Sequence, residues 1–330
     1  MNKAVSTFFL FAALALSVPA DIHENAGIAR YDFLDIGAGA QPMAMAGAYA
    51  GASGDIYSLY WNPAGIAGMP RPVFMADYFH YAMGIQRGMV GAVLDSSFCR
   101  GWGTLGFAIN YLNAGIFETV DEFGNHIPGN DFSAGYNVFS ATFARSLPEY
   151  RGYLFSAGVT FKQLLENIAD YSSYGSALDF GAHCVFPSKG LKIGLSVRNL
   201  GTVFSEDSSR LPQTYTLGII YNSKSWPNSR FAFDVVKPRY GVYEARLGLD
   251  YRVNRDLNIR LGYRFLEDEV RYWYHKIRGD SDNYVREDFN FFSAGIGLKL
   301  SRKMVCDLAL NINDYQTLPF ISTSLLYTLW

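Results

Sequence analysis

Apolar and polar residues alternate along much of this chain in stretches of about ten residues, and this alternation predicts β-strands. From Tyr243 to Arg252 the odd-numbered residues are apolar and the even-numbered residues are polar or glycine, and Leu257 to Phe265 repeat the pattern. A period of two places the two sets on opposite faces of a sheet. About ten residues is also the length that crosses a bilayer when a strand is tilted. The pattern therefore predicts an all-β protein, a transmembrane antiparallel β-barrel.

Fourteen strands can be placed from residue 72 onward. Their expected spans are 72–80, 86–95, 103–116, 133–146, 153–165, 172–186, 190–198, 212–222, 229–236, 242–252, 257–265, 290–300, 303–312 and 320–330. An even number of strands brings both ends of the barrel to the periplasmic side. Every second connection should then be a short turn, as in 147–152, 187–189, 253–256 and 301–302. The longer segments 117–132, 199–211 and 266–289 are expected at the outer surface.

Charges of both signs lie on the polar faces, so we expect them to line the lumen. Two registers are open for the hairpin of 242–252 with 257–265: Asp250 faces Arg260, or Glu244 faces Arg264. Either register places opposite charges side by side, as cross-strand pairing favours.

Asp179 and His183 lie four residues apart on the inward face of one expected strand. Ser176 has the opposite parity and points outward, so no nucleophile aligns with them. We therefore interpret both as lumen-lining residues and expect no enzymatic activity.

The first twenty residues are typical of a cleaved secretory signal. Lys3 gives the basic start, Phe8 to Leu16 are continuously apolar, and Val18 to Ala20 end in a small residue suited to cleavage. No other run of the sequence approaches the roughly eighteen apolar residues of a membrane-spanning helix. A formal net charge of −2 does not favour nucleic acid. No Cys/His spacing typical of a metal site occurs, and no cofactor is expected.

Residues 21–70 do not alternate. They are rich in glycine and alanine from Ile36 to Gly51, and Tyr60 to Gly68 then read Tyr-Trp-Asn-Pro-Ala-Gly-Ile-Ala-Gly. Asn62 before Pro63 predicts a helix start with Asn62 as its cap. Because this apolar segment is no transmembrane strand, we expect it to be buried in the lumen. The chain is thus predicted to comprise a signal peptide (1–20), an N-terminal hatch (21–70) and an outer-membrane barrel (71–330).

These segments resemble those of a known family. The Gly/Ala-rich stretch followed by Leu59 to Gly65 is similar to the N-terminal part of the PorV/PorQ (UPF0164) group, which is related to FadL-type long-chain fatty-acid porins. Gly103–Phe107, Asp121–Asn125, Leu195–Gly201 and Leu261–Arg264 resemble strand and loop motifs of the same group. The resemblance implies a fourteen-stranded barrel closed by an internal hatch. In FadL-like proteins hydrophobic ligands leave sideways through the wall, whereas PorV works with the type IX secretion apparatus.

The leading functional expectation is binding and passage of a hydrophobic, long-chain fatty-acid-like molecule. The alternative is a PorV-type component that holds exported proteins during type IX secretion, with secretion-system proteins as partners. Outer-membrane lipid is expected around the barrel. The last strand ends in Tyr327, Leu329 and Trp330, a pattern that barrel-insertion machinery recognises.

Two groups of residues are candidates for the ligand route. Asn62, Pro63 and Ala64 are interpreted either as a gate or as a structural cap that fixes the hatch. Tyr272, Trp273 and Tyr274, in the longest outer loop, are interpreted either as a ligand- or partner-catching lid or as interfacial anchors.

Overall fold

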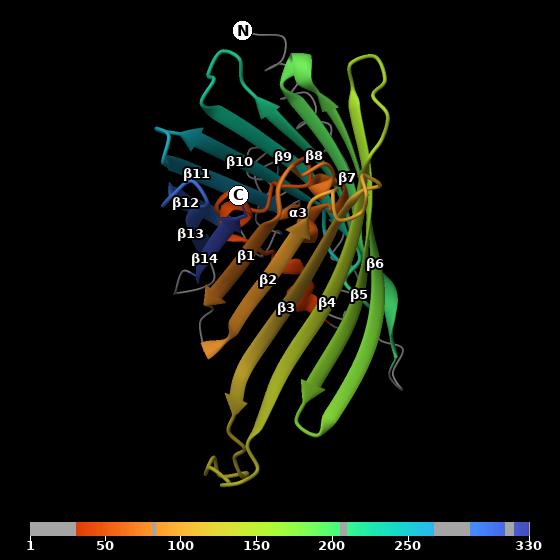
Figure 1. Ribbon diagram of the computed structural model, residues 1–330. Coiled ribbons are helices and arrows are strands. Elements are labelled where there is room, and N and C mark those ends of the chain that lie inside the picture. Colours follow the sequence, from red (N-terminus) through yellow and green to blue (C-terminus); the bar gives the residue numbers. More distant parts are fainter. Residues whose placement is uncertain (1–30, 81–83, 205–209, 267–290, 314–319, 330) are drawn as a thin grey trace, which may run out of the picture.

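The protein is a closed barrel of fourteen antiparallel strands (Figure 1). The computed structural model describes residues 31–80, 84–204, 210–266, 291–313 and 320–329. Each strand pairs with its neighbours along the chain, and the first strand pairs with the last, from Val73 opposite Thr328 to His80 opposite Ile321. The predicted barrel with an N-terminal plug is confirmed.

The strands begin and end close to their predicted positions. They are β1 (Val73–His80), β2 (Gln86–Leu94), β3 (Thr104–Phe117), β4 (Phe132–Ser146), β5 (Leu154–Ile168), β6 (Tyr171–Phe186), β7 (Leu191–Phe204), β8 (Thr214–Asn222), β9 (Ser229–Pro238), β10 (Glu244–Arg252), β11 (Leu257–Leu266), β12 (Phe291–Lys299), β13 (Met304–Asn313) and β14 (Phe320–Thr328). The described helical segments are short: η1 (Asp32–Asp35), α2 (Ala40–Ala44), α3 (Ser58–Trp61), η2 (Pro63–Ile66) and η4 (Pro187–Lys189). None of the helices in these ranges is long and apolar enough to cross a membrane.

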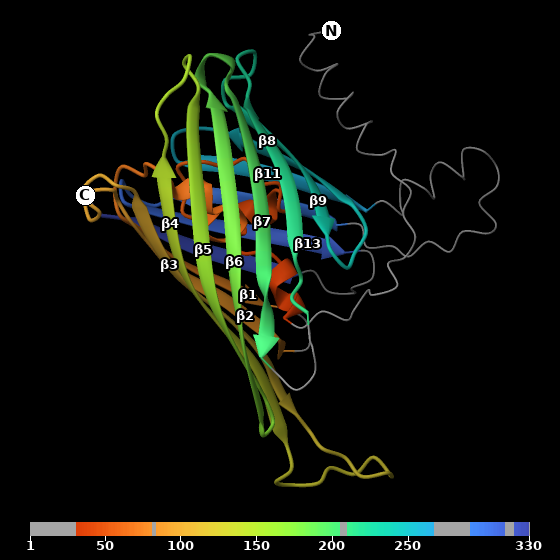
Figure 2. The same cartoon turned by 90° about the vertical axis from the view of Figure 1, so that its right-hand side faces the viewer.

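The wall is much taller on one side than on the other. Strands β3 to β7 have 14 to 16 residues, whereas the other strands have 8 to 10. Figures 1 and 2 show β3 to β6 running well past their neighbours toward the 118–131 loop. We call this the loop end of the barrel and the opposite end, where β1 starts and β14 finishes, the turn end.

The connections alternate between the two ends as expected, with two differences. Strands β5 and β6 are joined at the loop end by residues 169–170 alone, so this hairpin is tight. Strand β7 continues to Phe204, so the loop expected over 199–211 begins later, after residue 204.

A β-bulge explains why β7 is longer than its alternation indicates. Between Leu178 and Phe180 of β6 the register with β7 shifts. At this point Asn199 adopts a left-handed conformation with φ of 60°. The extra residue reverses the inward and outward order of the following side chains, and the simple period of two fails there.

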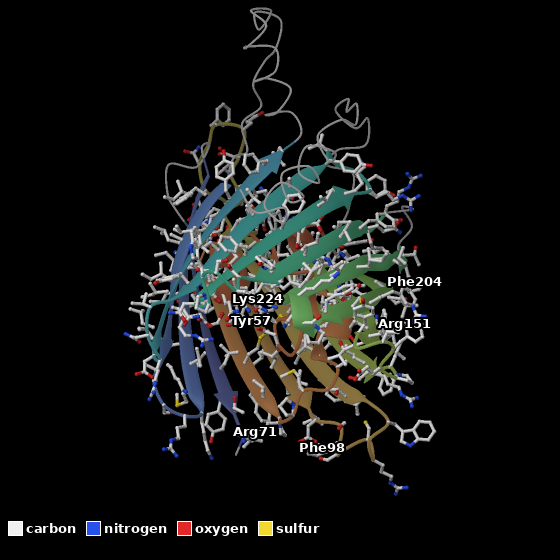
Figure 3. The ribbon with its side chains drawn as sticks, turned by 90° about the horizontal axis from the view of Figure 1, so that it is seen from above. Tyr57, Arg71, Phe98, Arg151, Phe204 and Lys224 are labelled. Atoms are coloured by element: carbon white, nitrogen blue, oxygen red, sulfur yellow. The ribbon has the colours of Figure 1, made fainter. Side chains whose placement is uncertain are left out.

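The N-terminal segment fills the inside of the ring of strands. Its apolar residues, among them Met45, Ile56 and Ile66, are fully buried and pack with inward-facing barrel residues such as Met75 and Met89 in one cluster. Tyr57 belongs to this cluster and is 1% exposed, whereas Phe98 and Phe204, labelled toward the edge of the molecule in Figure 3, are 61% and 62% exposed. The core of this protein is therefore the plugged lumen, and the outer wall carries large exposed apolar residues such as Phe107, Phe139 and Phe161.

Candidate functional site

The described part of the hatch, residues 31–69, is held in the lumen by barrel side chains that bind its backbone. Asp234 Oδ2 accepts hydrogen bonds from Tyr49 N (2.9 Å) and Ala50 N (2.8 Å). On the other side of the ring, Asp77 Oδ2 accepts from Gly39 N (3.0 Å). Buried backbone N–H groups outside regular structure need such partners. The barrel therefore supplies the hydrogen bonds that the hatch does not form within itself.

Hydroxyl groups of the barrel serve the same purpose. Ser293 Oγ lies 2.9 Å from Ala46 N and donates to Ala44 O at 3.1 Å. Ser324 Oγ accepts from Ala40 N at 2.6 Å and donates to Asp77 at 2.9 Å. No disulfide fixes the described part of the hatch to the wall, because the three cysteines are free.

Inward-facing glycines make room for the hatch. A Cβ on Gly181 would stand 2.0 Å from Asn62 Oδ1, and one on Gly194 would stand 2.0 Å from Ala50 O. A Cβ on Gly262 would likewise stand 2.3 Å from Ala46 N. Two of these glycines lie on the neighbouring strands β6 and β7 and the third lies on β11, so the hatch approaches the wall closely in two separate places.

Asn62 has two roles in the hatch. Its Oδ1 accepts from Ala64 N at 3.1 Å, with Pro63 in the first position of η2, so the predicted N-cap is confirmed. Its Nδ2 donates to Ala50 O at 2.8 Å. His183 Nε2 lies 2.7 Å from the same carbonyl, so the hatch motif and a barrel histidine converge on Ala50.

The hairpin of β10 with β11 takes the first of the two predicted registers, with Asp250 opposite Arg260. Arg260 is bound more closely by Asp307 (2.6 Å) than by Asp250 (3.5 Å). Asp307 also accepts a hydrogen bond from Tyr57 of the hatch at 3.0 Å. This part of the charged lumen therefore holds the hatch in addition to pairing within the wall.

The same register places Arg246 directly opposite Arg264. Glu244 lies between these two cations, 2.7 Å from Arg246 and 3.9 Å from Arg264. The pairing of Glu244 with Arg264 expected from the other register thus occurs diagonally. One carboxylate offsets the repulsion that two opposed arginines would otherwise cause.

Asp179 stabilises the bulge of β7. It binds Lys162 of β5 at 2.7 Å and accepts from the Asn199 backbone N at 2.7 Å. Lys162 also donates to Asn199 Oδ1 at 2.7 Å. Asp179 and His183 therefore serve different parts of the lumen, and they form no catalytic arrangement with each other.

An aromatic pair with three arginines forms a feature that strand patterns did not reveal. Tyr60 and Trp61 of α3 pack edge to face, with centroids 5.1 Å apart. Arg198 stands over both rings, at 5.2 Å from Tyr60 and 5.5 Å from Trp61. Arg87 lies 5.3 Å from Tyr60, and Arg246 lies 5.8 Å from Trp61. Cation–π contacts therefore join α3 to β2, β7 and β10.

A second apolar cluster lies toward the loop end, and we call it the outer apolar cluster. Its members are Tyr31, Phe33, Leu34, Leu112, Val138, Leu164, Ala177, Val203 and Leu211. The first three come from the start of the described hatch, and most of the others face inward from the tall wall of β3 to β7. In Figure 2 the red start of the hatch lies nearer the 118–131 loop than the orange segment around α3 does.

The outer wall carries an apolar groove of about 530 Å³ across β1 to β5. Aromatic rings border it, including Phe74, Phe107 and Phe139, and small residues such as Gly91 form part of its lining. On the inner side of the same wall, a Cβ on Gly91 would lie 3.2 Å from Leu59 of the hatch. The wall is therefore thin between this groove and the hatch.

The 118–131 loop is organised by Asp121. This carboxylate accepts from the backbone N of Phe123 (2.9 Å) and Asn125 (2.8 Å) and from Asn125 Nδ2 (3.0 Å). The Asn125 side chain and then its backbone N–H hold the pKa of Asp121 below its usual range. No cluster of His, Cys, Asp or Glu in the described ranges is arranged to hold a metal ion.

Two groups of residues that the sequence analysis singled out cannot be placed in the structure. Tyr272, Trp273 and Tyr274 lie outside the described residues, as does the expected signal peptide at 1–20. Their roles stay predictions.

Comparison with known proteins extends the description of the fold. No family model matches this chain, and no curated protein matches its sequence. Among solved structures, the toluene transporter TodX of Pseudomonas putida is 13% identical, with a TM-score of 0.58 over 88% of this chain and 98% of that chain. The fold is that of FadL-type outer-membrane barrels.

Two further structures have the same fold. The monoaromatic hydrocarbon channel CymD is 10% identical, with a TM-score of 0.55 over 89% of this chain and 98% of that chain. A FadL homologue of Pseudomonas aeruginosa is 10% identical, with a TM-score of 0.51 over 87% of this chain and 97% of that chain. These neighbours are outer-membrane transport proteins rather than enzymes. The PorV/PorQ resemblance has no counterpart among the family models and stays a prediction.

Proposed function

We propose that this protein binds a hydrophobic small molecule of the long-chain fatty-acid kind and passes it across the outer membrane. The observation that carries the proposal is the apolar hatch, whose described part closes a FadL-type barrel and is held there without a disulfide. If the barrel were a water-filled pore, it would need no apolar plug. If the hatch served only as a structural core, it would need no barrel around it. The structural neighbours described as transporting toluene and monoaromatic hydrocarbons support the same class of ligand.

The proposed route begins at the loop end, where the outer apolar cluster offers the first apolar surface inside the barrel. It leaves sideways through the wall, as the resemblance to FadL-like proteins implies. The groove across β1 to β5 supports an exit there, because Leu59 of the hatch lies directly behind Gly91 and Gly106 of the wall.

In this proposal Asn62, Pro63 and Ala64 fix the part of the hatch that must give way. The Asn62 contact to Ala50 O breaks when this part moves, whereas the cap on η2, which joins Asn62 to Ala64, moves with it. Tyr272, Trp273 and Tyr274 would act as a lid over the loop end.

A second candidate is a PorV-type role in type IX secretion. The one-sided wall favours it, because its tip exposes apolar side chains such as Ile116 (75% exposed) and Phe123 (81% exposed). Apolar surface of this kind suits a protein partner.

Native mass spectrometry of the barrel, extracted gently from its own outer membrane, separates the two candidates. The proposal predicts a lipid- or fatty-acid-sized adduct that is lost on activation, with no protein attached. A stoichiometric protein partner without a small-molecule adduct would contradict it and favour secretion.

A further inference from the structure

Basic side chains gather at the turn end of the barrel. Each connection between strands at this end carries an exposed lysine or arginine, and these residues are Arg100, Arg151, Lys189, Lys224, Arg255, Arg302 and Lys303. The acids of the same connections are Asp95, Glu149 and Asp256. The 118–131 loop, by contrast, has four acidic residues and no lysine or arginine. The turn end is therefore the basic end of the barrel.

Aromatic rings stand among these cations. Arg151 lies over the ring of Tyr150 at 5.2 Å, and Lys189 lies over the ring of Phe186 at 5.8 Å. In outer-membrane barrels the short turns face the periplasm, and aromatic girdles lie at the level of the lipid head groups. Basic residues at that level attract anionic lipids.

Under one of these turns the outer wall has a groove of about 500 Å³. It is lined by Phe231 of β9, by Leu249 and Tyr251 of β10, and by residues 225–229 of the turn between β8 and β9. The exposed ring of Trp226 stands 6.1 Å from that of Phe231. The groove therefore has an apolar part on the membrane-facing wall and a polar rim in the turn.

Two cations adjoin the polar rim. Lys224 directly precedes residues 225–229, and its Nζ donates to Ser188 O at 2.5 Å, which leaves two further N–H groups. Arg252 N donates to Asn228 O at 2.9 Å and so holds the end of β10 against the turn. Both side chains are exposed, and neither forms an ion pair within the described ranges.

We propose that this groove binds an anionic phospholipid of the periplasmic leaflet. One acyl chain lies against Phe231, Leu249 and Tyr251, and Lys224 and Arg252 bind the phosphate of the head group. A net negative head group fits best, because the two cations have no carboxylate partner and repel a head group that carries its own ammonium. The apolar lining favours a lipid over a soluble acidic protein. This site lies outside the lumen and is separate from the passage proposed above.

The test is lipid retention by the full barrel, measured by native mass spectrometry. The barrel in a non-ionic detergent is mixed with equal amounts of dioleoyl phosphatidylglycerol, which is anionic, and dioleoyl phosphatidylethanolamine, which is zwitterionic. Because the acyl chains are identical, the ratio of the two lipid-bound forms reports the head group alone. Wild type should retain the phosphatidylglycerol several times more often.

The variants are Lys224→Gln and Arg252→Gln, with Arg252→Lys to retain the charge. Arg239→Gln is the matched control, because Arg239 is an exposed arginine in the connection at the other end of β9 and β10. Each glutamine variant should reduce the preference for phosphatidylglycerol about fivefold, the effect of one basic residue near an anionic surface. Arg252→Lys and the control should keep the preference, and Trp226→Ala should weaken retention of both lipids alike. The usual heat-dependent gel shift shows that each variant is folded.

Three results would overturn the inference. Equal retention of the two lipids by wild type would leave the basic turns to a soluble acidic partner. A preference unchanged in both glutamine variants would show that Lys224 and Arg252 do not bind the head group. An equal reduction in Arg239→Gln would assign the preference to the overall charge of the barrel and not to this groove.

Discussion

At the scale of single residues, Asn62 is the clearest link between the sequence and the hatch. The Asn-Pro pair predicted the cap on η2 because the chemistry of a cap is local. The contact of Nδ2 with Ala50 O could not be predicted, since it joins residues twelve positions apart in a segment without regular structure.

Replacing Asn62 by alanine should loosen the hatch by about 1 kcal/mol through the lost cap. We expect faster hydrogen exchange of amides in 62–69, with the thermal midpoint of the barrel nearly unchanged because the strand ladder is intact. Asn254→Ala is the control, since Asn254 makes similar local bonds in an exposed turn. Equal exchange in the two variants would show that Asn62 does not fix the hatch.

The glycines of the lumen wall give a second prediction at this scale. Gly181→Ala should displace η2 at a cost of about 1–3 kcal/mol, because its Cβ overlaps Asn62. Gly135→Ala, where the Cβ meets only Leu112 O at 3.6 Å, should be tolerated. Protease sensitivity of the hatch distinguishes them, and an equally resistant Gly181→Ala variant would contradict the described fit.

At the scale of elements, the period of two predicted the strands well but not the bulge in β7. The buried trio of Lys162, Asp179 and Asn199 comes from three strands, and no local pattern marks it. Arg198 and Asn199 together oppose Asp179 at the bulge, so the position of this arginine over Tyr60 also escaped prediction. A similar limit applies to the arginine contacts with α3, because cation–π contacts depend on tertiary packing.

Asn199 allows the bulge itself to be tested. Asn199→Gly and Asn199→Ala both remove the contacts to Lys162 and Pro212, but only alanine must strain to reach a φ of 60°. The free energy of unfolding of the Asn199→Ala variant should therefore be about 1 kcal/mol lower than that of the Asn199→Gly variant. Identical unfolding of the two variants would mean that the left-handed backbone at this position costs nothing.

The 118–131 loop should respond to acid. The lowered pKa of Asp121 means that the folded loop prefers the charged carboxylate. Its contribution is therefore present above the ordinary pKa of about 4 and is lost as the pH falls through the lowered value. We expect amide exchange in 121–125 to rise relative to neighbouring loops below that point, and Asp121→Asn to show the rise already at neutral pH.

Glu122→Gln is the control for this loop, as a substitution of the adjacent exposed acid. An acid response that survives in Asp121→Asn would place the titrating group elsewhere.

At the scale of the whole molecule, the barrel is built around its hatch. Aspartates and serines bind the hatch backbone, glycines admit it, and arginines pack on its aromatic pair. The alternation of residues predicted the barrel, and the failure of alternation before residue 70 predicted the plug. The detailed fit depends on contacts between distant parts of the chain, which a single sequence does not reveal.

The measurement that tests the central claim most directly is uptake through a barrel whose hatch can be locked. Ala40 of the hatch adjoins Ser324 of β14, with 2.6 Å between Ala40 N and Ser324 Oγ, so a disulfide between cysteines at these two positions is the lock to introduce, and a free-thiol count checks that it forms. Labelled oleate uptake would be followed in cells that lack their own outer-membrane transporter for it. We predict that wild type restores uptake, that the oxidised double variant does not, and that reduction recovers it. Equal uptake with the hatch locked and unlocked would contradict passage through the lumen.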